Sequence, residues 1–273
     1  MNLFGLNGIG ETVDDFNYIA TTRLNLLFPF SNDLVILDDI IYNQLTDLQK
    51  FCNKRILILG GGPSTNEVNW QNIEYDYVFS MNNFFMNPKF ENINIDLLAV
   101  GAEVDHQNSK FISYINNYNP ILMFEIHDRW YNEKNYFNML YNSYPKISCF
   151  HSRIYGKLGV GIRLMMLAIA LQASEIYLVG VDGCPGLSVS SRKFVNANHS
   201  FEFGKTKLPY LITADNAYDV YYQQYNILWN YILNKLELNT RIYNLGEFSD
   251  YNFTSIWSKQ YFPLTSNILT KIK

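Results

Sequence analysis

The sequence lacks the features that define several large classes of protein. Of its 273 residues only three are cysteine, and none of them forms a Cys-x-x-Cys pair. Few scattered cysteines in odd number argue against a secreted disulfide scaffold and against a structural zinc site. Lys and Arg number 21 against 25 Asp and Glu, a net charge of −4. The basic excess typical of nucleic-acid-binding proteins is therefore missing, and we expect no nucleic-acid partner.

Long apolar runs are scarce as well. The most apolar segment, Leu164–Leu171, is too short to span a bilayer. The stretch Met1–Asp15 has no basic start followed by an apolar run, so we expect no signal peptide. We predict a cytoplasmic protein and leave peripheral contact with the inner face of the membrane open. Hydrophobic residues make up 48% of the chain and charged residues 17%, which favours a folded domain with a sizeable core.

Short apolar runs recur along the chain, and several of them end in Gly, Asn or Asp. Such runs are typical of buried parallel strands. The predicted strands are Arg55–Leu59, Tyr77–Met81, Ile95–Val100, Pro120–Phe124, Lys146–Phe150 at an edge, Glu175–Asp182 and Arg241–Leu245. Helical spacing is found near the end of Leu34–Phe51 and over Ile162–Gln172 and Asp215–Leu236. The alternation predicts an α/β fold with a Rossmann-like, largely parallel sheet and flanking helices.

The chain shows no repeat and no low-complexity linker. We predict a partly helical lead-in over residues 1–53 and one main domain over 54–273. Residues 183–209, a polar stretch containing Gly and Ser, are expected to form a loop or lid. The last part, Gly246–Lys273, is rich in aromatic residues and is expected to be irregular.

A glycine-rich turn follows the first predicted strand. Ligands of open α/β sheets bind beyond the carboxyl ends of the strands, and this turn consists of Gly60, Gly61, Gly62, Pro63, Ser64 and Thr65. Glycines let a backbone approach a ligand closely, and the N–H groups of a helix start suit a phosphate. The turn matches neither the dinucleotide fingerprint nor a Walker loop. A tight turn without a ligand stays the alternative.

Other predicted strand ends and one predicted helix start supply further candidates for binding a nucleotide. These are Asn82 and Asn83, Gly101, the helix start Gly159-Val160-Gly161, and Asp182. The two amides offer donors and acceptors, and the helix start is a second candidate anion site. Each also has a structural interpretation: asparagine in a turn, a closely packed helix start, and a carboxylate that caps a loop. No Asp-x-Asp pair occurs at Asp182, which disfavours a Mg²⁺-dependent sugar-nucleotide reaction.

His199 lies in the predicted lid. A loop histidine near strand ends can act as a general base, and Asp215, just beyond the lid, is the candidate to orient it. The alternative is a surface histidine. No histidine of the chain is spaced as in a His-Glu-x-x-His metal site.

Taken in order, three segments resemble the bacterial sialyltransferases of glycosyltransferase family 42 and the related motility accessory factor (DUF115) group. The segments are Ile56–Thr65 (ILILGGGPST), Phe79–Phe84 (FSMNNF) and Gly159–Asp182 (GVGIRLMMLAIALQASEIYLVGVD), and the resemblance covers about 54–245. It implies a Rossmann-like domain with a lid, a CMP-activated sugar as donor, a glycan or glycoprotein acceptor, and inverting transfer without a metal or other cofactor. It also implies a homo-oligomer.

The resemblance assigns roles to matching residues. It places Gly60–Ser64, Asn82 and the segment Lys157–Gly161 against the nucleotide, and it makes His199 the general base. A lid tyrosine of the family has no counterpart between Cys184 and Asn198. Two alternatives therefore stay open: an ATP- and Mg²⁺-dependent diphosphokinase acting on a pterin, with Asp105 and Asp182 as candidate metal ligands, and a nucleotide-sugar-binding protein without catalysis.

Overall fold

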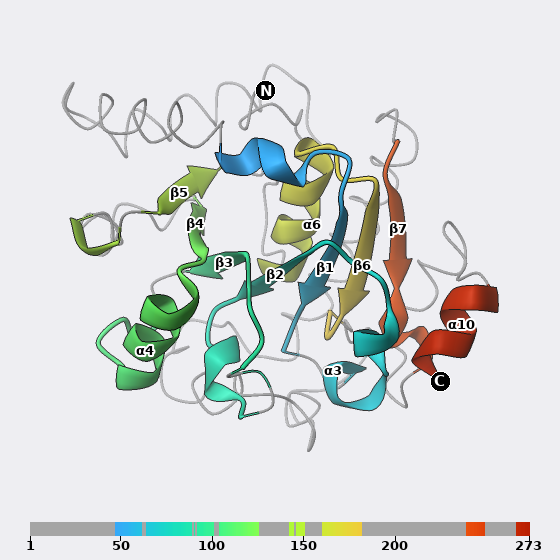
Figure 1. Cartoon of the computed structure of the whole chain (residues 1–273), viewed down its shortest axis with the longest axis horizontal. Helices are drawn as coiled ribbons and strands as arrows, with labels where there is room; N and C mark the ends of the chain where they lie inside the picture. The colour runs from blue at the N-terminus through green and yellow to red at the C-terminus, as the bar shows by residue number, and fades with distance from the viewer. Residues whose placement is uncertain are drawn as a thin grey trace, which may run out of the picture.

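Seven strands form one sheet in the computed structural model (Figure 1). The structure describes residues 47–61, 64–88, 90, 92–100, 104–125, 142–144, 146–150, 160–181, 239–248 and 266–273. The strands are β1 Arg55–Leu59, β2 Tyr77–Met81, β3 Leu97–Val100, β4 Ile121–Glu125, β5 Ile147–Phe150, β6 Glu175–Val179 and β7 Arg241–Asn244. Their order across the sheet is β5-β4-β3-β2-β1-β6-β7. Every pair of neighbours is parallel, which confirms the predicted fold class.

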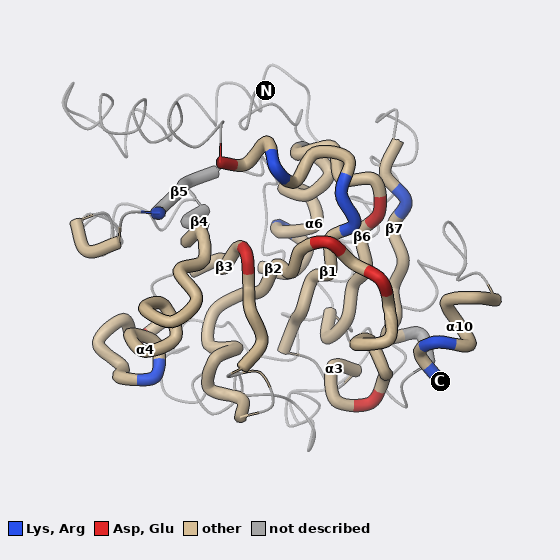
Figure 2. Tube along the Cα trace, viewed as in Figure 1, with Lys and Arg blue, Asp and Glu red and all other residues tan. Residues whose placement is uncertain are grey.

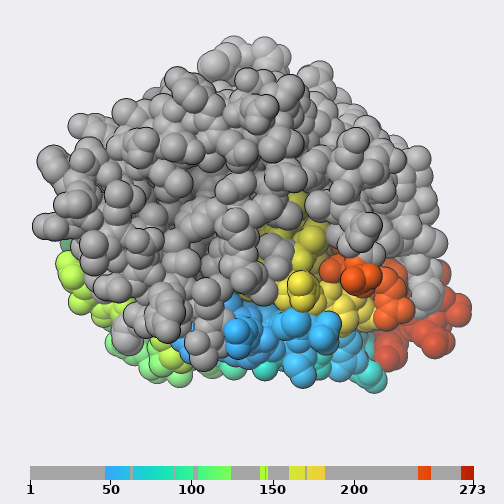
Figure 3. Space-filling view, turned by 90° about the horizontal axis from the view of Figure 1, so that it is seen from above, coloured from blue at the N-terminus to red at the C-terminus, as the bar shows by residue number. Residues whose placement is uncertain are grey.

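Helices cover both faces of the sheet. They are α3 Ser64–Glu67, α4 Ser109–Tyr118, α6 Val160–Ala170 and α10 Ser266–Ile272, with the 3-10 turns η1 Gln49–Phe51, η2 Trp70–Asn72, η3 Phe84–Met86 and η5 Leu245–Phe248. Seen from the end of the sheet where β1, β6 and β7 begin, the blue, yellow and orange segments of the chain lie next to one another (Figure 3), in line with the strand order β1-β6-β7. The predicted lid, the helix Asp215–Leu236 and residues 1–46 of the lead-in lie outside the described residues, and the domain division stays a prediction.

Two apolar clusters fill the space between sheet and helices, because successive side chains of a strand point to opposite faces. Leu57 and Leu59 of β1 pack in one cluster with residues of α4, α10, η2 and η3. Ile56 and Ile58 pack in the other cluster with α6 and η1. The centre of the molecule is thus a three-layer sandwich in which β1 contributes to both cores.

The ends of two strands, β3 and β6, differ from the prediction by more than one residue, for local reasons. Ile95 precedes β3, and its amide donates to the hydroxyl of Tyr114 in α4 (2.9 Å). β6 ends at Val179, because Gly180 adopts a left-handed φ of +69° that extended strands do not contain.

The prediction of an irregular end over Gly246–Lys273 is wrong for α10. This helix is held to the residues around η2, since Asn69 N–H donates to the carbonyl of Ile272 (3.2 Å) and Asn72 Nδ2 donates to that of Lys271 (3.0 Å). Helix α4 was not foreseen either. Its N-cap, Asn108, accepts a hydrogen bond from Lys110 N–H (2.9 Å), a standard cap for a helix start.

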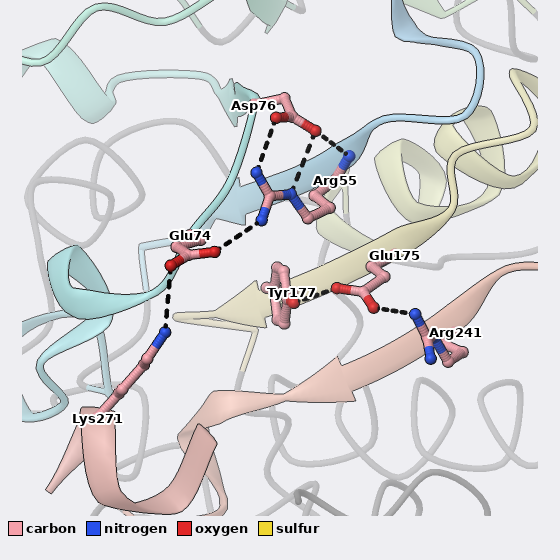
Figure 4. A network of polar contacts seen from close by, with 7 residues as sticks. All are labelled: Arg55, Glu74, Asp76, Glu175, Tyr177, Arg241 and Lys271. Carbon is pink, nitrogen blue, oxygen red and sulfur yellow. Dashed lines mark hydrogen bonds and ion pairs between the residues drawn. The ribbon is translucent and has the colours of Figure 1, made fainter. Parts of the chain in front are cut away.

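A polar network surrounds the amino ends of β1, β6 and β7 (Figures 2 and 4). Arg55, the first residue of β1, donates to both carboxylate oxygens of Asp76 (3.3 and 3.0 Å) and to Glu74 (3.1 Å). Lys271 of α10 pairs with Glu74 at 3.6 Å. Glu175 accepts from Tyr177 and pairs with Arg241 across the neighbouring strands. Through Lys271, the network links the residues around β1 to α10, the last helix of the described chain.

We predict that Asp76→Asn lowers the free energy of unfolding at pH 7 by about 1 kcal/mol, since the forked ion pair is about one-third exposed. The hydrogen bond from Arg55 lowers the pKa of Asp76 below its ordinary 3.8. The pair's stabilisation is therefore full above that value and disappears as the pH falls through the lowered pKa. Urea unfolding from pH 7 downward measures the difference between the two proteins.

The matched control is Glu74→Gln, whose side chain is 72% exposed. We expect this change to have almost no effect on the free energy of unfolding at pH 7. Equal losses for both variants would contradict the assignment of the stabilisation to the Arg55–Asp76 pair.

Candidate nucleotide site at the carboxyl ends of β1 and β6

The order of the strands reverses between β1 and β6. From β1 the chain runs outward through β2 to β5, and it then returns to the other side of β1 with β6. Figure 1 shows that the arrowheads of these two strands lie at the same end of the sheet. Crevices at such reversal points, outside the carboxyl ends of the strands, are where open α/β sheets bind ligands. The candidate site is therefore defined by the residues that follow β1 and β6.

The backbones of Gly60 and Gly180 approach each other closely at this point. Gly60 N–H donates to the carbonyl of Val179 (2.7 Å). A Cβ atom on Gly60 would lie 2.2 Å from the carbonyl oxygen of Gly180, and one on Gly180 would lie 2.0 Å from Thr65 Oγ1. Gly180 also has the positive φ that only glycine adopts without strain. A side chain at either position would prevent the close contact between the two backbones, so both positions require glycine.

The hydroxyls of Ser64 and Thr65 bond to these two strand ends. Thr65 Oγ1 donates to the carbonyl of Gly60 (2.9 Å), and Gly180 N–H donates to Ser64 Oγ (2.7 Å). Both residues are buried, with 0% and 3% of their surface exposed. The indole N–H of Trp70 donates to the carbonyl of Thr65 (2.9 Å), which fixes α3 to the residues of η2. These hydroxyls therefore hold the loops together.

Helix α6 begins beside the same strand ends. A Cβ atom on Gly161 would lie 2.9 Å from a methyl of Val181 and 3.4 Å from the methyl of Met81. The first turn of α6 therefore packs against the residue that follows Gly180 and against the last residue of β2. The helix has eleven residues and no acidic residue in its first turn. The amino end of α6, with its partial positive charge, therefore lies at the end of the sheet where the candidate site lies.

The two asparagines after β2 adopt a turn. Asn82 has a φ of +51° and donates its N–H to the carbonyl of Ala99 (2.8 Å), a conformation that asparagine tolerates better than most residues. Asn83 is 5% exposed and precedes η3 without capping it by its side chain. The turn accounts for the backbone of this pair, while a role of either amide in binding stays a prediction.

The structure brings together the described members of the predicted site. Gly60, Ser64, Thr65 and Gly161 are linked through Gly180 and Val181, with Gly61 and Val160 next to them in the chain and Asn82 following the strand end at Met81. The other predicted residues lie outside the described residues: Gly62, Pro63, Gly101, Lys157, Gly159, Asp182, His199 and Asp215. The sequence placed Gly180 within the predicted strand Glu175–Asp182 and gave no sign of its bond to Ser64, which lies 116 residues away.

Among the residues that the structure describes, no group of three or more His, Cys, Asp or Glu side chains is placed to hold a metal ion. None of the helices in that part of the chain is both long and apolar enough to cross a membrane.

Comparison with known proteins finds no matching family model and no matching curated protein. Solved structures of the sialyltransferase CstII resemble the chain. The complex of the Campylobacter jejuni enzyme with CMP-3FNeuAc has 17% identity and a TM-score of 0.49, covering 79% of this chain and 87% of that one. The complex with a trisaccharide acceptor and CMP has 17% identity and a TM-score of 0.47, with coverages of 73% and 84%. The complex of the Campylobacter jejuni enzyme with CMP alone has 18% identity and a TM-score of 0.37, with coverages of 47% and 68%.

We predict that Gly180→Ala destabilises the protein by about 3 kcal/mol, because it adds left-handed strain and a clash with Thr65 and the Gly60 backbone. Gly161→Ala is the control. Its Cβ atom would meet side-chain methyls of Val181 and Met81 and no backbone, and it would bring no left-handed strain, so we expect a smaller loss of about 1 kcal/mol. Urea unfolding compares the two variants. A Gly180→Ala protein as stable as the control would show that the two strand ends are not in tight contact.

Proposed function

We propose that this protein is a sialyltransferase-like glycosyltransferase that transfers a sialic or related nonulosonic acid from a CMP-activated sugar to a glycan or protein acceptor. One observation carries the proposal. The segments on which the family resemblance rests are distant in sequence, yet their described residues converge at the reversal point of the sheet. A chance resemblance gives no reason for its segments to share the position where α/β sheets bind nucleotides.

The proposed donor phosphate lies at the start of α6. This helix has three turns, whereas α3 has four residues, a single turn. In a single turn the opposite partial charges of the two helix ends lie close together and largely offset each other, so the longer helix provides the stronger field at its N-terminus. Backbone N–H groups there and in the turn after β1 would stabilise the negative charge that develops on the departing CMP. Fixed donors of this kind contribute a few kcal/mol to a transition state.

The proposed reaction is a single displacement at the anomeric carbon. The acceptor hydroxyl oxygen forms a bond to that carbon as the bond to the phosphate oxygen breaks, and CMP leaves with the electron pair. His199 takes the proton of the acceptor hydroxyl, and Asp215 orients its imidazole. The leaving phosphate is neutralised by N–H groups, so the proposal needs neither a metal nor another cofactor.

We expect CMP to stabilise the protein without added metal. A ligand at about 100 times its dissociation constant adds about 2.7 kcal/mol to the free energy of unfolding, a rise in Tm of roughly 5 to 10 °C. A thermal-shift series with CMP, UDP, GDP, ADP, ATP and CMP-sialic acid, each with and without Mg²⁺, measures the effect. Stabilisation by ATP with Mg²⁺ alone would instead favour the diphosphokinase.

Replacement of the predicted base tests catalysis separately from binding. We expect His199→Ala to lower the rate of CMP release from CMP-sialic acid, with a panel of glycan acceptors, by about 10²- to 10⁴-fold. Its affinity for CMP should stay that of the wild type. Unchanged turnover would remove His199 from the mechanism. Binding of the donor by the wild type without any turnover would favour the non-catalytic nucleotide-sugar-binding protein.

A further inference from the structure

We infer that Ser64 and Thr65 are positioning residues, which set the place of the first turn of α6 relative to the turn after β1. They act through Gly180 and Val181. The inference rests on the proposed function, because it concerns how the proposed nucleotide site is assembled. It differs from the role that the resemblance implies, in which this turn contacts the nucleotide directly.

The two hydroxyls satisfy polar groups where the β1–β6 pairing ends. The register of the two strands runs to Leu59 and Val179, and Gly60 N–H still donates to Val179. Just beyond, the carbonyl of Gly60 accepts from Thr65 and the N–H of Gly180 donates to Ser64. Buried backbone groups require such partners. One short helix thus bonds both strand ends and fixes their positions relative to each other.

Gly180 transmits this arrangement to α6. Its left-handed φ turns the chain out of β6, and the next residue, Val181, places its methyl groups where they meet the first turn of α6 at Gly161. Gly161 has no side chain that would keep the helix away from Val181. A chain of direct contacts therefore runs from Ser64 through Gly180 and Val181 to the N–H groups proposed to bind the donor phosphate.

The burial of Ser64 and Thr65 favours positioning over direct contact. Their exposed fractions are 0% and 3%, and each hydroxyl bonds to backbone at a distance of 2.7 to 2.9 Å. Because almost none of their surface is exposed, a ligand could reach these hydroxyls only if the surrounding chain moved. Their effect on a nucleotide is therefore indirect, through the geometry of the backbone groups around it.

The test compares Thr65→Val, Thr65→Ser and Ser64→Ala by the dissociation constant for CMP, measured by calorimetry well below each Tm. Thr65→Val keeps the shape of the side chain and loses the donor, and we expect CMP binding to weaken about tenfold. Ser64→Ala loses the partner of Gly180 N–H and should weaken it to a similar degree. Thr65→Ser keeps the hydroxyl, and its CMP binding should stay near that of the wild type.

Thr240→Val is the matched control. Thr240 is 4% exposed, and its hydroxyl donates to the carbonyl of Ala173 (2.6 Å) at the opposite end of the sheet. The Thr240→Val protein loses a comparable buried hydrogen bond. Its free energy of unfolding should therefore fall, while its affinity for CMP should stay unchanged. Equal weakening in Thr240→Val and Thr65→Val, or none in Thr65→Val and Ser64→Ala, would overturn the inference.

Failure of the proposed function gives a different result. A wild-type protein that binds no CMP under these conditions refutes the proposed function, and with it the inference, before any variant is compared. If Ser64→Ala does not fold, the comparison of Thr65→Val with Thr65→Ser decides the question alone. Those two variants differ in whether position 65 keeps its hydroxyl.

Discussion

The parallel pairing of β1 with β6 is the interaction on which the described structure depends. Strands β2, β3, β4 and β5 lie on one side of this pair and β7 lies on the other, so the pairing joins the two parts of the sheet. Alternate residues of β1 enter both apolar clusters, so the strand also holds the helical layers together. Because the two strands end in glycines, their backbones come close enough for one short helix to bond both. The position of the candidate site follows from this one pairing.

The two ends of the sheet stabilise themselves in different ways. At the amino ends, the first residue of each strand is charged and forms an ion pair (Figure 4). These residues are Arg55, Glu175 and Arg241. At the carboxyl ends of β1 and β6, buried hydroxyls and glycine backbones take the place of charged side chains. Backbone N–H groups at strand ends and helix starts attract anions. Among the described residues, the ion pairs thus lie at one end of the sheet and the predicted nucleotide site lies at the other.

The strands could be predicted from the sequence because each is a short run of apolar residues, as in RILIL and EIYLV. Helix α4 was not predicted, although Phe111, Tyr114 and Ile115 of SKFISYINNY recur at helical spacing and form its buried face. The glycine turns were recognised as a candidate site from their place after strands. The bond between Ser64 and Gly180 was not, because it depends on which strand lies beside β1, and the sequence does not state the order.

That bond joins residues 116 positions apart, which has a consequence during synthesis. At roughly 5 to 20 residues per second, β1 emerges on the order of ten seconds before β6. Strands β2 to β5 can pair on one side of β1 in that time, while its other edge stays open. This edge is an apolar strand, the type of surface that pairs with other chains. The strand that completes the candidate site therefore also protects the nascent chain from aggregation.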